Sequence, residues 1–130
     1  MELLPTKPEL KFHVGAAYAW IGQYDKAIPL LNDSKAGFND KNLWIVLGRS
    51  YKGLGKVDSA IFCWEKSITM YPKLLLPRLW LANMHYEHGE IELALNYLEE
   101  IIAIKPKAES IHSHAIKQDA IKLSSMIVDG

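Results

Sequence analysis

A repeat of 33 to 34 residues constrains this chain more than any other feature of its sequence. Three similar segments, GQYDKAIPLL, GKVDSAIFCW and GEIELALNYL, begin at Gly22, Gly55 and Gly89, and these glycines are 33 and 34 residues apart. The same intervals separate Ala27, Ala60 and Ala94. Such a period predicts stacked copies of one supersecondary element, because a single copy cannot bury its apolar side alone.

The middle repeat has the pattern of two amphipathic helices. Its apolar residues recur at spacings of three and four, first at Leu43, Leu47, Tyr51 and Leu54 and then at Ile61, Trp64 and Ile68. Gly48 and Ala60 are small enough for two helix axes to approach closely there. We predict helices over residues 9–21, 25–36, 41–54, 58–71, 75–88 and 91–104.

Glycine and proline mark the expected helix ends. Gly22, Gly55 and Gly89 stand where a first helix must end, and glycine adopts the left-handed conformation of such a cap at little cost. Pro72 and Pro106 are expected to stop the second helices, because proline cannot donate the next backbone hydrogen bond.

These residues resemble the tetratricopeptide repeat (TPR), whose pattern is W-x2-L-G-x2-Y, then A-x3-F, then P. The middle repeat matches at Trp44, Leu47, Gly48, Tyr51, Ala60, Trp64 and Pro72. The first departs at Lys11, Leu31 and Asn39, and the third at Arg78, Ala82, His85 and Leu98. The resemblance implies an all-α fold, a right-handed α-solenoid of three TPR helix hairpins plus a C-terminal capping helix.

The repeats divide the chain into segments. We predict three TPR units over residues 8–107, namely 8–40, 41–74 and 75–107. Residues 1–7 are interpreted as the remnant of a preceding helix or a linker, because Pro5 lies two repeat lengths before Pro72; a frayed terminus is the alternative, and whether Met1 is a natural start stays open. Residues 108–130 are predicted to be the capping helix, with a partner-binding helix as the alternative. Its expected pattern involves Ile111, Ala115, Gln118, Ile121 and Met126.

The family geometry places the first helix of each unit on a concave face. The residues expected to bind a partner there are Phe12, Trp20, Ile45, Arg49, Lys52, Leu79, Trp80, Asn83 and Tyr86. This apolar and aromatic groove predicts a non-catalytic protein–protein interaction scaffold that binds a peptide or partner segment, as a fragment of a larger protein. A carboxylate clamp is not expected, since its positions hold Phe12, Ala16, Val46, Leu76 and Trp80.

Other uses of the same aromatic residues stay open. They can pack on the rest of the parent chain, or Trp20 and Trp80 can form the contact of a homo-oligomer. The stretch YPKLLLPRLWLANMHYEHGEIELAL from Tyr71, with IIAIKPKAES and AIKQDA, is similar to the C-terminal repeat tail of bacterial O-antigen ligase or polymerase family membrane proteins. That resemblance implies an accessory C-terminal domain whose groove is used intramolecularly.

Composition and motifs argue against several other functions. Fifteen basic residues balance 15 acidic ones, so we expect no nucleic-acid partner, and no apolar run is long enough for direct membrane insertion by this segment. The lone Cys63 and the pair His85 and His88 lack the neighbours of a nucleophile or a metal site, and no P-loop, GxGxxG, GxSxG or HExxH motif occurs. We predict no enzymatic activity, cofactor or metal, and a soluble domain, cytoplasmic or periplasmic, alone or attached to a membrane protein.

Overall fold

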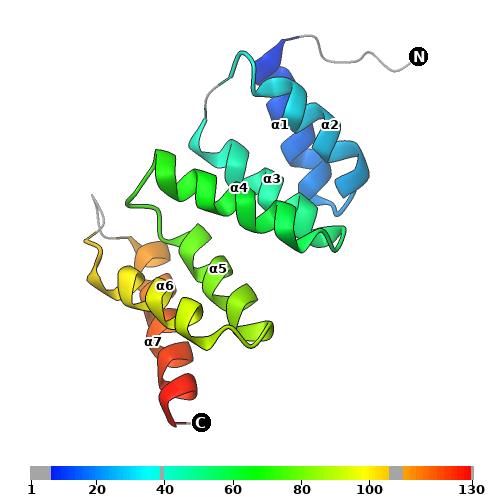
Figure 1. Cartoon of the computed structure of the whole chain (residues 1–130). Helices are drawn as coiled ribbons and strands as arrows, with labels where there is room; N and C mark the ends of the chain where they lie inside the picture. Colours follow the sequence, from blue (N-terminus) through cyan, green and yellow to red (C-terminus); the bar gives the residue numbers. More distant parts are fainter. Residues whose placement is uncertain (1–6, 39, 106–109, 130) are drawn as a thin grey trace. The chain divides into compact units, whose positions relative to one another are not determined.

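The regular structure of this chain is helical throughout the part that the structure describes. A computed structural model describes residues 7–38, 40–105 and 110–129 (Figure 1). Its seven helices are α1 (Pro8–Trp20), α2 (Tyr24–Ser34), α3 (Lys41–Gly53), α4 (Val57–Met70), α5 (Leu76–Glu87), α6 (Ile91–Ala103) and α7 (Ile111–Asp129). The predicted all-α class is confirmed.

The first six helices begin and end within two residues of the predicted positions. Gly22, Gly55 and Gly89 have φ values of 84°, 77° and 78°, so the predicted left-handed caps are confirmed. The expected N-terminal remnant over residues 1–7 and the stop at Pro106 fall outside the described residues, apart from Lys7.

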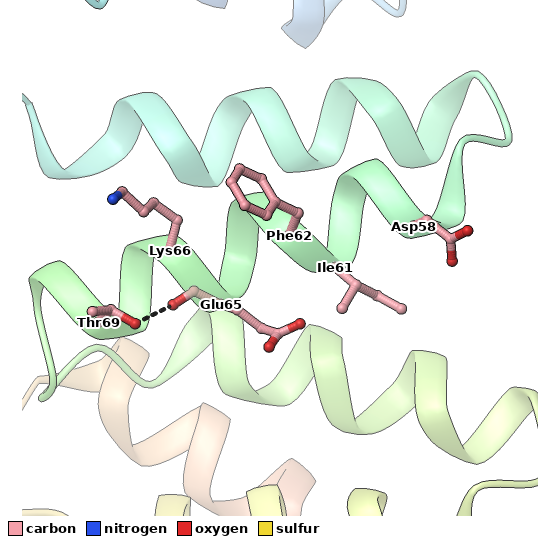
Figure 2. A pocket seen from close by; sticks show the side chains of 6 residues that line it. All are labelled: Asp58, Ile61, Phe62, Glu65, Lys66 and Thr69. Carbon is pink, nitrogen blue, oxygen red and sulfur yellow. Dashed lines mark hydrogen bonds between the residues drawn. The ribbon is translucent and has the colours of Figure 1, made fainter.

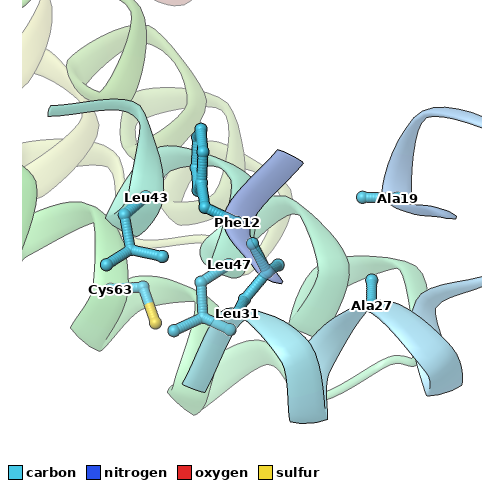
Figure 3. Packing of buried hydrophobic residues seen from close by; sticks show 7 residues of the cluster. All are labelled: Phe12, Ala19, Ala27, Leu31, Leu43, Leu47 and Cys63. Atoms are coloured by element: carbon cyan, nitrogen blue, oxygen red, sulfur yellow. The ribbon is translucent and has the colours of Figure 1, made fainter. Parts of the chain in front are cut away.

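The chain divides into two compact units, residues 1–70 and residues 71–130, which we call the N-terminal and the C-terminal unit. In the N-terminal unit α1 pairs with α2, α3 pairs with α4, and α2 packs against α3. Figure 3 shows the buried residues of this core, which are Phe12, Ala19, Ala27, Leu31, Leu43, Leu47 and Cys63. The two hairpins therefore share one apolar core.

In the C-terminal unit α5 pairs with α6, and α7 packs on α6. The buried core residues are Leu75, Leu79, Ala82, Leu98, Ile101, Ala120 and Leu123. The residues of the expected helical pattern do not form the buried side of α7, because Ile111 is 86% exposed and Ile121 and Met126 are also exposed. The face turned to the core holds Ala120 and Leu123, with Ile116 and Ile127 packed beside them.

The hydrogen bonds of Lys117 explain which side of α7 faces α6. Its Nζ donates hydrogen bonds to the carbonyl oxygens of Ile101, Ile102 and Ile104 at 3.0, 3.1 and 2.6 Å. These carbonyls lie at the end of α6, where the last helical residues have no intrahelical donor. The lysine therefore satisfies the end of α6 and fixes the face that α7 turns toward it.

The expected close approach of two helices at Gly48 is present. A Cβ atom built on Gly48 would overlap the indole ring of Trp64, whose Nε1 donates to the Ile45 carbonyl at 3.2 Å. The corresponding pair in the third repeat is Ala82 with Leu98, and both are fully buried. Where the third repeat has Ala82 in place of glycine on its first helix, it has Leu98 in place of the larger tryptophan on its second helix.

The departures from the tryptophan of the repeat pattern are matched on the partner helix. Lys11 lies 4.0 Å from the carboxylate of Asp33, and Arg78 lies 3.0 Å from that of Glu100. In the middle repeat Lys66 stands at the corresponding place, 6.0 Å from the ring centre of Trp44. The same pair of positions on the two helices therefore forms an ion pair in the first and last hairpins and a cation–π contact in the middle hairpin.

Candidate functional site

The N-terminal unit presents an exposed tryptophan held by an arginine. Trp20, the last residue of α1, is 76% exposed, and the guanidinium of Arg49 in α3 lies 5.2 Å from its ring centre. Ile45, Arg49 and Lys52 follow one another on one side of α3, with Ile45 half-buried and the two cations exposed. We call Trp20, Ile45, Arg49 and Lys52 the Trp20 surface.

Phe12, which was predicted to bind a partner beside these residues, is instead part of the core. Its ring is 6% exposed and lies 5.1 Å from the ring of Phe38. A side chain buried in this way cannot reach a partner without unfolding its surroundings, so we leave Phe12 out of the Trp20 surface.

Four predicted residues belong to α5 in the C-terminal unit. Leu79 is only 7% exposed and packs in the core, so it too is unavailable to a partner. Trp80 and Asn83 are half-buried and Tyr86 is exposed. These three side chains are at adjacent positions on one side of α5 and form a separate set from the Trp20 surface.

His85 in α5 and His88, the residue that follows α5, both have hydrogen-bonding or stacking partners. His85 is 8% exposed, its ring is stacked on Tyr97 at 5.8 Å, and its Nδ1 lies 3.3 Å from a carboxylate oxygen of Glu90. Nδ1 of His88 lies 2.7 Å from the Met84 carbonyl oxygen. Within residues 7–38, 40–105 and 110–129, no group of three His, Cys, Asp or Glu side chains is placed to hold a metal ion.

Cys63 is buried in α4 and is 2% exposed. Burial raises the pKa of its thiol from the usual 9.0 to about 11, although the nearby charge of Lys35 acts in the opposite direction. The thiol is therefore protonated at neutral pH and is a poor nucleophile.

A second surface of the N-terminal unit was missed in the sequence. Phe62 in the middle of α4 is 62% exposed, and a groove of about 280 Å³ beside it is lined by residues of α3, α4 and the end of α2. The repeat contains a signal that could have found it, since Phe62 corresponds to Pro29 and Asn96 in the other repeats. An aromatic residue stands where the neighbouring repeats do not have one.

The comparisons with known proteins support the tetratricopeptide-repeat family. Residues 42–74 match the model of a tetratricopeptide repeat, which is the middle repeat. A TPR repeat-containing protein of Methanocaldococcus jannaschii is 34% identical over 73 residues, 56% of this chain and 23% of that protein. Superkiller protein 3 of Schizosaccharomyces pombe is 29% identical over 68 residues, 52% of this chain and 5% of that protein. The matches thus span less than a quarter of these relatives.

Solved structures show the fold. PcrH from Pseudomonas aeruginosa has a TM-score of 0.81 at 16% identity, over 98% of this chain and 96% of that chain. PcrH in complex with the chaperone binding region of PopB has a TM-score of 0.75 at 16% identity, over 89% and 93%. The type III secretion translocator chaperone SycD of Yersinia enterocolitica has a TM-score of 0.71 at 20% identity, over 95% and 89%. Among the described residues, no helix is long and apolar enough to cross a membrane.

Proposed function

We propose that this chain is a non-catalytic protein-interaction scaffold that binds a peptide segment of a partner through the Trp20 surface. The observation that carries the proposal is the stack of Arg49 on a tryptophan that is 76% exposed. Tryptophan and arginine are the residues most enriched among those that dominate binding energy at protein interfaces. The stack also holds the indole in place before a partner arrives, which lowers the entropy lost on binding.

The similarity to solved structures supports a peptide as the partner. One of those neighbours, PcrH, was solved with the chaperone binding region of PopB. At 16% identity the likeness concerns the fold, so it supports the class of partner, a peptide segment, and not its identity. Helical repeats of this kind present the exposed side of a first helix to an extended or helical segment. In the C-terminal unit, Trp80, Asn83 and Tyr86 on α5 form a second set of side chains that we propose as a contact for a partner.

The test begins with a photo-crosslinking amino acid at Lys52, next to the Trp20–Arg49 stack, in the full-length protein. Crosslinked peptides identified by mass spectrometry give the partner segment, which is then titrated against the purified chain. We expect Trp20→Ala and Arg49→Ala each to weaken binding about tenfold or more. Ile111→Ala, at a residue that is 86% exposed on α7, is the matched control.

The double variant Trp80→Ala/Tyr86→Ala tests the α5 residues separately. Unchanged affinity in this variant removes α5 from the site, and unchanged affinity in the Trp20 and Arg49 variants overturns the Trp20 surface.

Two rival functions give different results in the same experiment. A crosslink within the protein's own chain would indicate an accessory domain whose surface is used intramolecularly, as the predicted similarity to polysaccharide ligases implies. A homo-oligomerisation module would crosslink to a second copy and would show a dimer by light scattering at high concentration. A monomer at high protein concentration would exclude the homo-oligomerisation function.

A further inference from the structure

Phe62 is exposed where the repeat has no packing need for an aromatic side chain. The corresponding residues of the first and third repeats, Pro29 and Asn96, are exposed as well. The other two repeats are therefore built without an aromatic group at this place, and the middle repeat alone exposes 62% of a phenylalanine there.

Phe62 belongs to a cluster around Trp44. The two rings meet edge to face, with their centres 6.3 Å apart at 71°. The ammonium groups of Lys35 and Lys66 lie 4.5 and 6.0 Å from the centre of the Trp44 ring. We call Lys35, Trp44, Phe62 and Lys66 the Phe62 surface. Figure 2 shows Phe62 and Lys66 projecting from the same side of α4.

The two lysines are not neutralised by the fold. In the other hairpins the place of Lys66 holds a carboxylate, Asp33 or Glu100, which pairs with Lys11 or Arg78, whereas in the middle repeat Lys66 faces the uncharged Trp44. Among the residues that the structure describes, no carboxylate lies within ion-pair distance of Lys35 or Lys66. The ammonium groups of Lys35 and Lys66 are thus available to the carboxylates of a ligand while they lie over the Trp44 ring.

A groove with a largely apolar lining lies beside Lys35, Trp44 and Phe62. The lining of this groove of about 280 Å³ includes Trp44, Phe62 and the buried Leu47 and Cys63; the other lining residues are Lys35, Tyr51, Asp58 and Ser59. Because the Cys63 thiol stays protonated, this part of the lining is uncharged. The groove suits one aliphatic or aromatic side chain rather than a flat polar ligand.

This surface is separate from the Trp20 surface. Trp44 and Arg49 both lie on α3, but five residues correspond to a rotation of about 140° around a helix axis. The acidic residues near the groove also restrict its ligand. Asp58 lines it and Glu65 lies about two turns further along α4, so a continuous polyanion such as a nucleic acid would be repelled along that stretch.

We propose that the Phe62 surface is a second docking site, which takes an acidic peptide segment of a partner protein. One apolar side chain of that segment enters the groove beside Phe62, and flanking carboxylates pair with Lys35 and Lys66. The proposal rests on charge complementarity and does not require the Trp20 surface to bind anything.

The experiment is an NMR titration of the full chain with the peptide Ac-EDLFED-NH2. We expect saturable shifts at the Trp44 indole N–H and at the amides of Lys35, Phe62 and Lys66. The neutral peptide Ac-QNLFQN-NH2 and the peptide Ac-EDSGED-NH2, which lacks the apolar pair, should each bind at least tenfold more weakly. These two controls separate the contribution of charge from that of the apolar side chain.

Protein variants complete the test. Phe62→Asn introduces the residue of the third repeat at an exposed site, so the fold should persist, and it should weaken the acidic peptide about tenfold. Lys35→Glu/Lys66→Glu should abolish binding. The exposed residues Asn96 and Lys122 provide matched controls, since Asn96→Ala and Lys122→Glu should leave the affinity unchanged.

Four results would overturn the proposal. They are the absence of saturable shifts at millimolar peptide, shifts that gather at Trp20 and Arg49 instead, equal affinity for the neutral peptide, and tighter binding of an oligothymidylate than of the acidic peptide. The first two leave the scaffold function of the Trp20 surface intact, and the last would indicate a nucleic-acid partner.

Discussion

At the scale of single residues, the contact between Gly48 and Trp64 sets how closely α3 and α4 approach. The indole ring lies where a side chain on residue 48 would extend, and its N–H is bound to the Ile45 carbonyl on the same helix as Gly48. The ring therefore has little freedom to move away, because a shift would also break a hydrogen bond in a buried place.

We predict that Gly48→Ala lowers the free energy of unfolding by about 1–3 kcal/mol, because overpacking outweighs the better helix propensity of alanine. Urea denaturation checks this. The matched control is Gly48→Ala/Trp64→Leu, which recreates the Ala82–Leu98 pair of the third repeat. If the double variant loses the full sum of the two single effects, the two residues are not in steric conflict and the explanation is wrong.

A second prediction concerns Cys63. Its thiol pKa of about 11 in the folded chain, against 9.0 in the unfolded chain, means that folding favours the protonated thiol. This contribution to stability is complete below pH 9 and is lost as the pH rises through 11. We expect alkylation by iodoacetamide at pH 8 to be much slower in the native chain than in urea. Equal rates would mean that the thiol is not buried.

At the scale of whole helices, α7 is held by a single lysine as well as by its apolar face. Lys117 bonds three carbonyl oxygens at the end of α6. A hydrogen bond to a charged group contributes about 1.5–3 kcal/mol, and the lost partner would leave those carbonyls to water.

We predict that Lys117→Met lowers the free energy of unfolding by about 1–3 kcal/mol and increases hydrogen exchange in α7. Lys122→Met, at an exposed position of the same helix, is the control and should change little. Unchanged exchange in α7 would show that its apolar contacts alone hold it.

The pair Arg78–Glu100 yields the next prediction. The Arg78 side chain is 8% exposed while that of Glu100 is 52% exposed, so removing the carboxylate leaves a nearly buried cation with only the Leu74 carbonyl as partner. Because the pair is half open to solvent, we expect Glu100→Gln to cost about 1–2 kcal/mol of unfolding free energy rather than more. Thermal unfolding compared with Glu99→Gln, the exposed neighbour, checks it. A loss no larger than that of the control would contradict it.

The hairpins could be predicted from the sequence because their signals are local. Gly22, Gly55 and Gly89 mark the turns, and a spacing of three and four marks each apolar stripe. The face of α7 could not be predicted in this way. The partners of Lys117 are backbone carbonyls of another helix, and a carbonyl is present at every residue, so no residue type indicates which lysine will find them.

The candidate site was predicted only in part, for a related reason. Trp20 is exposed and its predicted role in binding stays a prediction, whereas Phe12 and Leu79 are buried in the cores. The sequence assigns a residue to a helix more securely than to one side of it, and Phe38, which packs on Phe12, comes from a connection rather than a repeat position. Phe62 was not identified as a surface residue, because an aromatic residue in a helix that alternates apolar and polar positions is usually assigned to the buried side.

At the scale of the whole molecule, the chain has two separate buried clusters, one in each compact unit. In helical repeats each element depends chiefly on its nearest neighbours, so stability need not be uniform along the chain. The residues that form each cluster therefore determine which helices open together.

We predict that Leu47→Ala raises hydrogen exchange in α1–α4 more than in α5–α7, and that Leu98→Ala does the reverse. Each removes a fully buried leucine, which costs about 2–5 kcal/mol. Exchange measured by mass spectrometry on the full chain resolves the helices. A uniform increase along the chain in both variants would show a single cooperative unit.

The variable position occupied by Lys11, Trp44 and Arg78 has a consequence for a chain made of near copies. During folding, a second helix can meet the wrong first helix, because all of them carry similar apolar stripes. Lys66 of α4 would meet Lys11 if α4 paired with α1 and Arg78 if it paired with α5. In its own hairpin Lys66 meets the uncharged indole ring of Trp44 on α3. Electrostatic repulsion therefore disfavours the pairing of α4 with α1 or α5 and favours its pairing with α3.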